Sequence, residues 1–325
     1  MRLAPLGGLH AERACYFLGE YIMAKRIVLA GGSGFLGQAL AASFLTDGYD
    51  VHVLSRGRAS RNLVGTIIPW DGATVGPWAE SLEDAAAVVN LTGKNINCRP
   101  TASNRDEIVR SRVASVKAVG EAIRRCSRPP RVFVQTTAVG IYGDAGNALC
   151  DESTAAGGGF LGETCKAWEK ALEESPTPGV RRVLLRLGVI FGRTGGAFPP
   201  LANLARWFLG GAVGSGRQYI SWLHIADAAR IYRAAIERDD MKGVYLAVSP
   251  QPVTNADFMR ALRAALHRPW SPPVPAFAAR LGGWVMGINV NLALESQCCV
   301  PRRLTEKGFA FEFPELGGAL KDLVG

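Results

Sequence analysis

Three glycines recur at a fixed spacing in residues 31–37, a G-x-x-G-x-x-G turn between an apolar run and a helix-length segment. Gly31 permits a tight turn, Gly34 lets the backbone approach a pyrophosphate, and Gly37 lets the helix pack closely on the preceding strand. Free N–H groups at the start of such a helix attract an anion. The pattern predicts a dinucleotide site, and the alternative is a glycine turn without a ligand. The predicted contact residues are Gly31, Ser33, Gly34, Phe35, Leu36 and Gly37.

The end of the next predicted strand carries the residues that would choose between two nicotinamide cofactors. An acidic side chain there would bind the ribose 2′-hydroxyl of NAD, whereas arginine would bind the 2′-phosphate of NADP. Ser55 and Arg56 occupy that position, and Asp50 starts the strand at its far end. NADP is therefore the predicted cofactor. Arg58 and Arg61 could assist Arg56, or they are solvated loop residues.

Small and polar residues also follow the predicted strand 86–91. Leu91, Thr92 and Gly93 would let the backbone run beside the ribose and phosphates of a bound dinucleotide. Asp71, which follows the strand before it, could meet the adenine amino group or simply start an Asp-Gly turn. These three residues at the end of the strand complete the predicted cofactor site.

The segments that must hold these residues alternate between β-type apolar runs and amphipathic stretches of helix length, which is typical of βαβ units. The run at 131–136 is apolar on both faces, as a sheet covered by helices on two sides requires. We predict an α/β fold with a Rossmann-type, doubly wound parallel sheet. The predicted strands are 26–30, 50–54, 66–69, 86–91, 131–136, 180–187 and 244–248; the predicted helices are 36–46, 106–126, 225–237 and 255–267, the last capped by Thr254; and the tail 276–325 has two more helical stretches around 309–313.

The chain divides into three predicted parts. Residues 1–22 are a leader or the product of a mis-assigned start, because Met23 stands just before the first strand. Residues 23–190 form the NADP-binding Rossmann domain. Residues 191–325 form mainly a smaller C-terminal substrate lobe over the carboxyl ends of the strands, where ligands of open α/β sheets bind, and 225–248 returns to the core.

Composition argues against several other classes of protein. The formal net charge is +9, but the basic residues are scattered among acids, so we expect no nucleic acid partner. Seven cysteines without CxxC pairs predict neither a disulfide framework nor a metal site, and they favour the cytoplasm. For the adjacent Cys298 and Cys299, small apolar fillers are preferred over a redox pair. No apolar run is long enough to span a membrane, so no membrane partner is expected.

Further motifs follow the glycine turn in order, at 89–93, 138–143, 186–190, 214–218, 221–225 and 313–316. Together they resemble the extended branch of the short-chain dehydrogenase/reductase superfamily, and in particular its atypical, sugar-nucleotide-epimerase-like members called epimerase family proteins. The resemblance covers residues 25–325. Two departures from the family pattern are Lys94, where relatives often carry Glu, and 135–137, which reads Gln-Thr-Thr where many carry Ser-Ala-Ser.

The resemblance implies a catalytic Tyr and a Lys four residues later on one helix face, where the ammonium stabilises a phenolate that moves a proton during hydride transfer. Leu161 and Cys165 stand at these positions, so the usual proton relay is missing. Thr137 would instead hydrogen-bond a substrate carbonyl or hydroxyl, Lys166 would reach the nicotinamide ribose, and Tyr142 would act as an acid or base. Each residue also has a structural alternative. The Thr137 hydroxyl could be bonded to backbone at the strand end, Lys166 could be a solvated helix residue, and Tyr142 could be a half-buried aromatic residue in a turn.

The resemblance also implies an arginine that holds the diphosphate of a nucleotide sugar, but Ile220 occupies the matching position. Arg217 could instead bind another anion. The wall of that anion site would be formed by Trp222, His224 and Asp227, or these residues would dock the helix that returns to the core. His224 is interpreted as a packing residue.

Two functions follow from these patterns. The first is an NADP(H)-dependent oxidoreductase or epimerase-like enzyme with an unidentified small-molecule substrate. The second is a non-catalytic NADP(H) sensor or regulatory scaffold, which the missing Tyr-x-x-x-Lys pattern favours. A third, a basic nucleic-acid-associated protein, rests on net charge alone.

Overall fold

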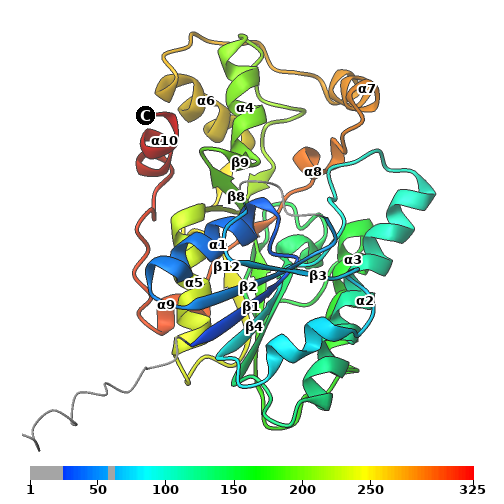
Figure 1. Cartoon of the computed structure of the whole chain (residues 1–325). Helices are drawn as coiled ribbons and strands as arrows, with labels where there is room; N and C mark the ends of the chain where they lie inside the picture. Colours follow the sequence, from blue (N-terminus) through cyan, green and yellow to red (C-terminus); the bar gives the residue numbers. More distant parts are fainter. Residues whose placement is uncertain (1–24, 58–62) are drawn as a thin grey trace, which may run out of the picture.

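Seven parallel strands form the centre of the structure, a computed structural model that describes residues 25–57 and 63–325 (Figure 1). The strands are β1 (Arg26–Ala30), β2 (Asp50–Ser55), β3 (Thr66–Pro69), β4 (Ala87–Asn90), β5 (Val132–Ala138), β7 (Arg181–Leu187) and β12 (Gly243–Ala247). Their order across the sheet is β12-β7-β5-β4-β1-β2-β3, and every neighbouring pair is parallel. The chain reverses its direction of sheet growth between β1 and β4, which creates a topological switch point at their carboxyl ends. The predicted doubly wound α/β sheet is confirmed.

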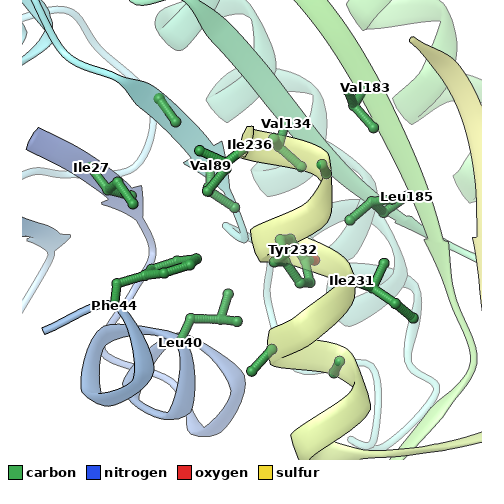
Figure 2. Close-up of a cluster of buried hydrophobic side chains, with 14 of the residues drawn as sticks. Ile27, Leu40, Phe44, Val89, Val134, Val183, Leu185, Ile231, Tyr232 and Ile236 are labelled. Atoms are coloured by element: carbon green, nitrogen blue, oxygen red, sulfur yellow. The ribbon is translucent and has the colours of Figure 1, made fainter. Parts of the chain in front are cut away.

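Helices cover both faces of this sheet. On one face lie α1 (Phe35–Thr46) and α5 (Ile225–Glu237), and Figure 2 shows Leu40 and Phe44 of α1 and Tyr232 of α5 among the strand side chains. The opposite face lies under the 3-10 helix η1 (Pro77–Leu82), α2 (Ala102–Arg125) and α3 (Gly159–Glu173). The central strands are apolar on both faces because each face is buried.

A second, smaller core follows the carboxyl ends of the strands. It gathers Phe191, Trp222 and Phe258 between α4 (Phe198–Arg206), α6 (Asn255–Ala265) and α10 (Leu316–Val324), the upper part of Figure 1. Short strands join this region to the main sheet: β8 (Val189–Gly192), β9 (Gly195–Gly196) and β11 (Trp222–His224) form one sheet, β10 (Tyr219–Ile220) pairs with β13 (Val253–Thr254), and β6 (Leu149–Cys150) pairs with β14 (Cys298–Cys299). The remaining elements are η2 (Val139–Tyr142), α7 (Ala276–Met286), α8 (Asn291–Leu294) and α9 (Arg302–Glu306).

The helices differ from the sequence prediction in two main respects. Helix α2 begins at Ala102 rather than at 106, because the Thr101 side chain caps it and accepts the Asn104 N–H. The tail contains the four helices α7–α10 where two are predicted. Helix α7 carries Gly282 and Gly283 in its interior, and glycine lowers helix propensity, so its sequence gives little sign of a helix.

Some predictions lie outside the described residues, namely those for residues 1–22 and for Arg58 and Arg61. Within the described part, no helix combines the length and apolar character needed to cross a membrane. The same part of the chain holds no group of three or more His, Cys, Asp or Glu side chains placed to bind a metal ion. Cys298 and Cys299 are buried in β14, in keeping with small apolar fillers.

Candidate functional site

The glycine turn joins the carboxyl end of β1 to the first turn of α1. Gly31 has a φ of +75°, and a Cβ built there would lie 2.8 Å from the Thr92 Oγ1. A Cβ on Gly37 would lie 2.5 Å from the Gly32 Cα, so α1 packs on the turn only because Gly37 has no side chain. Gly34 is the N-cap residue of α1, and no side chain caps the helix. The first N–H groups of α1 are therefore available to an anion.

The side chains of Phe35 and Leu36 pack away from this opening. The Phe35 ring lies on the hairpin of β8 and β9, where a methyl group at Gly192 or Gly195 would overlap it. Leu36 packs against the core between the sheet and the helices α1 and α5. Both residues can therefore offer a nucleotide their backbone N–H groups, while their side chains hold the turn in place.

The end of β2 meets the glycine turn directly. The Ser55 hydroxyl donates a hydrogen bond to the Ser33 hydroxyl at 3.0 Å. Arg56 follows and is exposed, with its Cδ 3.7 Å from a Cβ built on Gly72 in the loop after β3. The strand ends without an acidic residue, since Asp50 lies at its other end. The structure thus presents a cation beside the turn, where the sequence predicts one.

Residues 91–93 leave the carboxyl end of β4 beside the same turn. The Leu91 N–H donates to the Ala30 carbonyl at 2.9 Å, which holds this segment against β1. The Thr92 Oγ1 is buried and has no hydrogen-bond partner among the described residues. An unpaired buried hydroxyl is unfavourable, so this atom fits a ligand that supplies the missing partner. The glycine cradle, the cation and this hydroxyl together fit a phosphorylated dinucleotide.

Asp71 serves the turn after β3. Its carboxylate accepts the N–H groups of Ala73 and Thr74, both at 2.8 Å, and also the Thr74 hydroxyl. The hydroxyl and N–H of Thr74 lower the pKa of Asp71. Of the two interpretations of Asp71, the structure supports the Asp-Gly turn.

Thr137, at the end of β5, belongs to a buried polar network and is itself 1% exposed. Its hydroxyl donates to the Glu169 carboxylate on α3 at 3.1 Å. The Arg186 guanidinium on β7 donates to both oxygens of that carboxylate, at 2.9 and 2.8 Å. Burial opposes the charge on Arg186, but the Glu169 carboxylate outweighs burial, and the pKa of Arg186 is raised. A bidentate pair of this kind fixes both side chains in one orientation.

Tyr142 is part of the same network. It lies in η2 and is buried, its hydroxyl donates to the Asp151 carbonyl at 2.7 Å, and it accepts an N–H of Arg186 at 2.9 Å. Burial raises the pKa of Tyr142, although Arg186 opposes this rise. A hydroxyl whose partners come from the protein and whose pKa is raised is a poor acid or base near neutral pH. The geometry gives Tyr142 a packing role.

Helix α3 separates the candidates that the sequence places close together. Cys165 is buried, and burial raises the pKa of its thiol to about 12. Lys166 is the next residue, and consecutive helix residues point roughly 100° apart. Its ammonium pairs with Glu163 at 2.5 Å, and the side chain is 40% exposed. The structure therefore does not bring Lys166 into the network around Thr137.

Two residues of the returning helix hold it against the tail. The His224 Nδ1 accepts the Ala226 N–H at 3.2 Å and so caps α5, while the His224 ring packs on Phe313. Burial lowers the pKa of His224. The Asp227 carboxylate accepts the N–H groups of Glu312 and Phe313, at 2.7 and 2.9 Å. Of the two roles left open for these residues, the structure supports docking.

Arg217 lies apart from these contacts. It is exposed on a pocket of about 270 Å³, whose lining also includes Ser215, Tyr219 and Thr254. Trp222 is fully buried and donates its indole N–H to a backbone carbonyl, so it does not contribute to the wall of this pocket.

The loop after β4 also touches the second lobe. The Asn97 side-chain oxygen accepts the Asn289 N–H at 3.1 Å, between α7 and α8. The Arg99 guanidinium lies 6.0 Å from the centre of the Trp284 ring. These contacts connect the Rossmann sheet with the C-terminal lobe beside the switch point.

Sequence reasoning missed Glu169 and Arg186. Glu169 stands four residues after Cys165, on the same face of α3, and Arg186 lies in the apolar part of β7. A charged residue on the buried side of an otherwise apolar segment is the signal that identifies them, since such a charge needs a partner.

A doubly wound parallel sheet with a glycine turn at its switch point defines a Rossmann-type protein. Comparison with known families matches residues 27–247 to the NAD dependent epimerase/dehydratase family and residues 274–323 to a domain of unknown function, DUF1731. The chain belongs to the NAD dependent epimerase/dehydratase family.

Several relatives are similar over nearly their whole length. Epimerase family protein SDR39U1 of Bos taurus is 35% identical, over 92% of this chain and 99% of its own. Epimerase family protein YfhF of Bacillus subtilis is 32% identical, over 92% of this chain and 97% of its own. The crystal structure of human epimerase family protein SDR39U1 (isoform 2) with NADPH matches with a TM-score of 0.83 at 32% identity, over 92% of this chain and 99% of that one. The resemblance to epimerase family proteins is confirmed.

Proposed function

We propose that this protein is an NADP(H)-dependent oxidoreductase or epimerase-like enzyme whose small substrate lies between the Rossmann sheet and the second lobe. The observation that carries the proposal is the end of β2, where the exposed Arg56 stands beside the glycine turn and the strand itself ends without an acidic residue. The NADPH named with the human relative supports the same cofactor here. We place the protein in the cytoplasm on its cysteine usage alone.

In this proposal each part of the cofactor has its own residues. The N–H groups at the start of α1 hold the pyrophosphate, Arg56 with Ser55 holds the 2′-phosphate, and the segment after β4 lines a ribose. When bound, the cofactor donates or accepts a hydride at its nicotinamide ring. The proposed cofactor residues are Gly31, Ser33, Gly34, Phe35, Leu36, Gly37, Ser55, Arg56, Leu91, Thr92 and Gly93.

Thr137 is the residue that we propose to meet the substrate. While it donates to Glu169, its oxygen can accept a hydrogen bond from a substrate hydroxyl, which opens a path for a proton toward the carboxylate. Glu169 and Arg186 then act as positioning residues. Because Thr137 is buried, a substrate reaches it only when the side chains over the end of β5 move aside. Neither Lys166 nor the occupied hydroxyl of Tyr142 has a part in this path.

A second candidate is a non-catalytic NADP(H) sensor. The arrangement around α3 favours it, because Leu161 and Cys165 occupy the dyad positions and none of the three candidate catalytic side chains is both free and accessible in the described structure. In that case cofactor occupancy would change the surface offered to a protein partner.

One experiment separates the candidates. The protein is titrated with NADPH, and then incubated with NADPH or NADP⁺ and a panel of carbonyl compounds and alcohols, while the absorbance of NADPH is followed. Turnover that is lost in Thr137→Val, with an unchanged Kd for NADPH, supports the enzyme. Tight binding without turnover supports the sensor, and failure to bind NADPH rejects both.

A further inference from the structure

Arg112 lies near the middle of α2, and its guanidinium is packed between the cofactor segment and α3. A Cβ built on Gly93 would lie 3.0 Å from the Arg112 Cζ. On the other side, the same Cζ lies 4.9 Å from the centre of the Trp168 ring. The guanidinium is therefore held directly behind Gly93, and a cation over an indole face is favourable.

Only part of this guanidinium is used by the protein. Its Nη1 donates to the carbonyl oxygens of Lys94 and Ile108, both at 3.0 Å. A guanidinium has five N–H donors. In the described part of the chain no acceptor contacts Nε or Nη2, and no carboxylate lies within ion-pair distance of Arg112. These two nitrogens therefore keep N–H donors that a ligand oxygen could accept.

Burial is costly for such a cation. Desolvation lowers the pKa of Arg112, which means that its surroundings disfavour the charge. Arg186, which also lies beside α3, has the Glu169 carboxylate to balance its charge. Arg112 has no comparable partner in the described residues, and it retains donors that a ligand oxygen would satisfy.

Its neighbours place Arg112 where the missing lysine would act. The electrostatic influence between Arg112 and Cys165 is mutual, so the two side chains lie close to each other. Cys165 stands at the dyad lysine position, and the backbone of Ala138, next to Thr137, is close enough to lower the pKa of its thiol. A guanidinium reaching from α2 thus approaches the site that the dyad lysine of relatives would approach from α3.

We propose that Arg112 is a cofactor-binding residue, whose free N–H groups donate to the hydroxyl oxygens of the nicotinamide ribose in place of the missing lysine. The inference rests on the proposed function, because it assumes a bound NADP(H). It adds a residue outside the glycine turn, at the opposite end of the cofactor from Arg56. The two arginines would then hold the two ends of one ligand.

The two ends can be tested with two ligands. The compound 2′,5′-ADP carries the adenosine and the 2′-phosphate but no nicotinamide ribose, whereas NADPH carries both. In titration calorimetry, the Arg112→Met protein should bind NADPH about tenfold or more weakly than the wild type, because ligand hydrogen bonds are lost. Its Kd for 2′,5′-ADP should stay within about twofold of the wild-type value. Arg56→Ala should weaken both ligands. Arg110→Met, an exposed residue on the same helix, should weaken neither.

Other outcomes overturn the inference. If Arg112→Met binds NADPH like the wild type, or loses both ligands equally, Arg112 only supports the segment after β4. Arg112→Lys keeps the charge with fewer donors, so it should fold and show a smaller loss for NADPH alone; an unchanged Kd there, with Arg112→Met unfolded, also overturns the inference. A wild-type protein that binds no NADPH rejects the proposed function itself, which is a different result.

Discussion

The Thr137 hydroxyl donates a hydrogen bond to the Glu169 carboxylate, 3.1 Å away across the junction of β5 and α3. Glu169 lies one helical turn beyond Cys165, so α3 still carries a charged group next to the positions where the dyad is absent. Arg186 holds that carboxylate from β7. The polar centre at the end of β5 is therefore built from a hydroxyl, a carboxylate and a guanidinium.

Arg56→Ala should reduce the affinity for NADP(H) far more than the affinity for NAD(H). The Arg56 guanidinium would contact only the additional phosphate, and charge-assisted bonds of this kind contribute about 1.5–3 kcal/mol, or roughly 10- to 100-fold in Kd. Titration calorimetry with both dinucleotides measures the difference. Arg124→Ala, at the far end of α2, is the matched control. Equal losses for both dinucleotides would show that Arg56 does not read the 2′-phosphate.

Glu169→Ala should strongly destabilise the fold. It leaves the Arg186 guanidinium buried without its carboxylate, and breaking a buried pair in this way costs about 3–5 kcal/mol. Urea unfolding measures the loss. Glu163→Ala removes the exposed partner of Lys166 from the same helix, and it should change the stability by about 1 kcal/mol or less. Similar effects of the two substitutions would contradict the buried network.

Gly37→Ala should disrupt both stability and nucleotide binding. The added methyl group would press on the Gly32 backbone, which cannot rotate away as a side chain can, so α1 must shift at a cost of about 1–3 kcal/mol. Gly318→Ala is the matched control, because a Cβ there meets nothing within 4 Å in α10 and alanine should stabilise the helix by about 0.5–1 kcal/mol. Thermal unfolding and NADPH titration of both variants check this expectation. A Gly37→Ala protein as stable as the wild type would refute the close packing of α1 on the turn.

Acidification should destabilise the protein through His224. Burial lowers the pKa of His224 below its ordinary value of 6.5, so the unfolded chain takes up a proton first as the pH falls below that value. Stability is thereby lost as the pH falls below about 6.5. His224→Asn keeps a capping oxygen for α5 and removes this titration. The free energy of unfolding of this variant should therefore fall less steeply with decreasing pH than that of the wild type. His52, whose pKa burial also lowers, should account for part of what remains.

The sequence predicted the elements whose ends carry local signals. Strand β3 and helix α5 have the predicted bounds, and Thr254 caps α6 by accepting the Asp257 N–H. Helix α3 was expected only through the family resemblance, because it begins at glycines with no capping side chain. Its start is set by tertiary packing, since a Cβ on Gly162 would press on the backbone of Gly157.

The cofactor residues and the network around Thr137 also differ in how far the sequence predicts them. The glycine turn and Arg56 are contiguous with strand ends, so their spacing along the chain predicts their position in space. The network of Thr137, Glu169 and Arg186 joins three elements, and its partners depend on which side chains face one another across β5, α3 and β7. A single sequence carries no record of such pairings.

Phe35 gives the molecule a further property. Its ring fills the space that Gly192 and Gly195 leave free, so the first turn of α1 packs directly on the hairpin of β8 and β9. A shift of that turn would therefore press on the hairpin, and the hairpin leads into α4 of the second lobe. The nucleotide turn and the second lobe are thus linked through an aromatic side chain of α1.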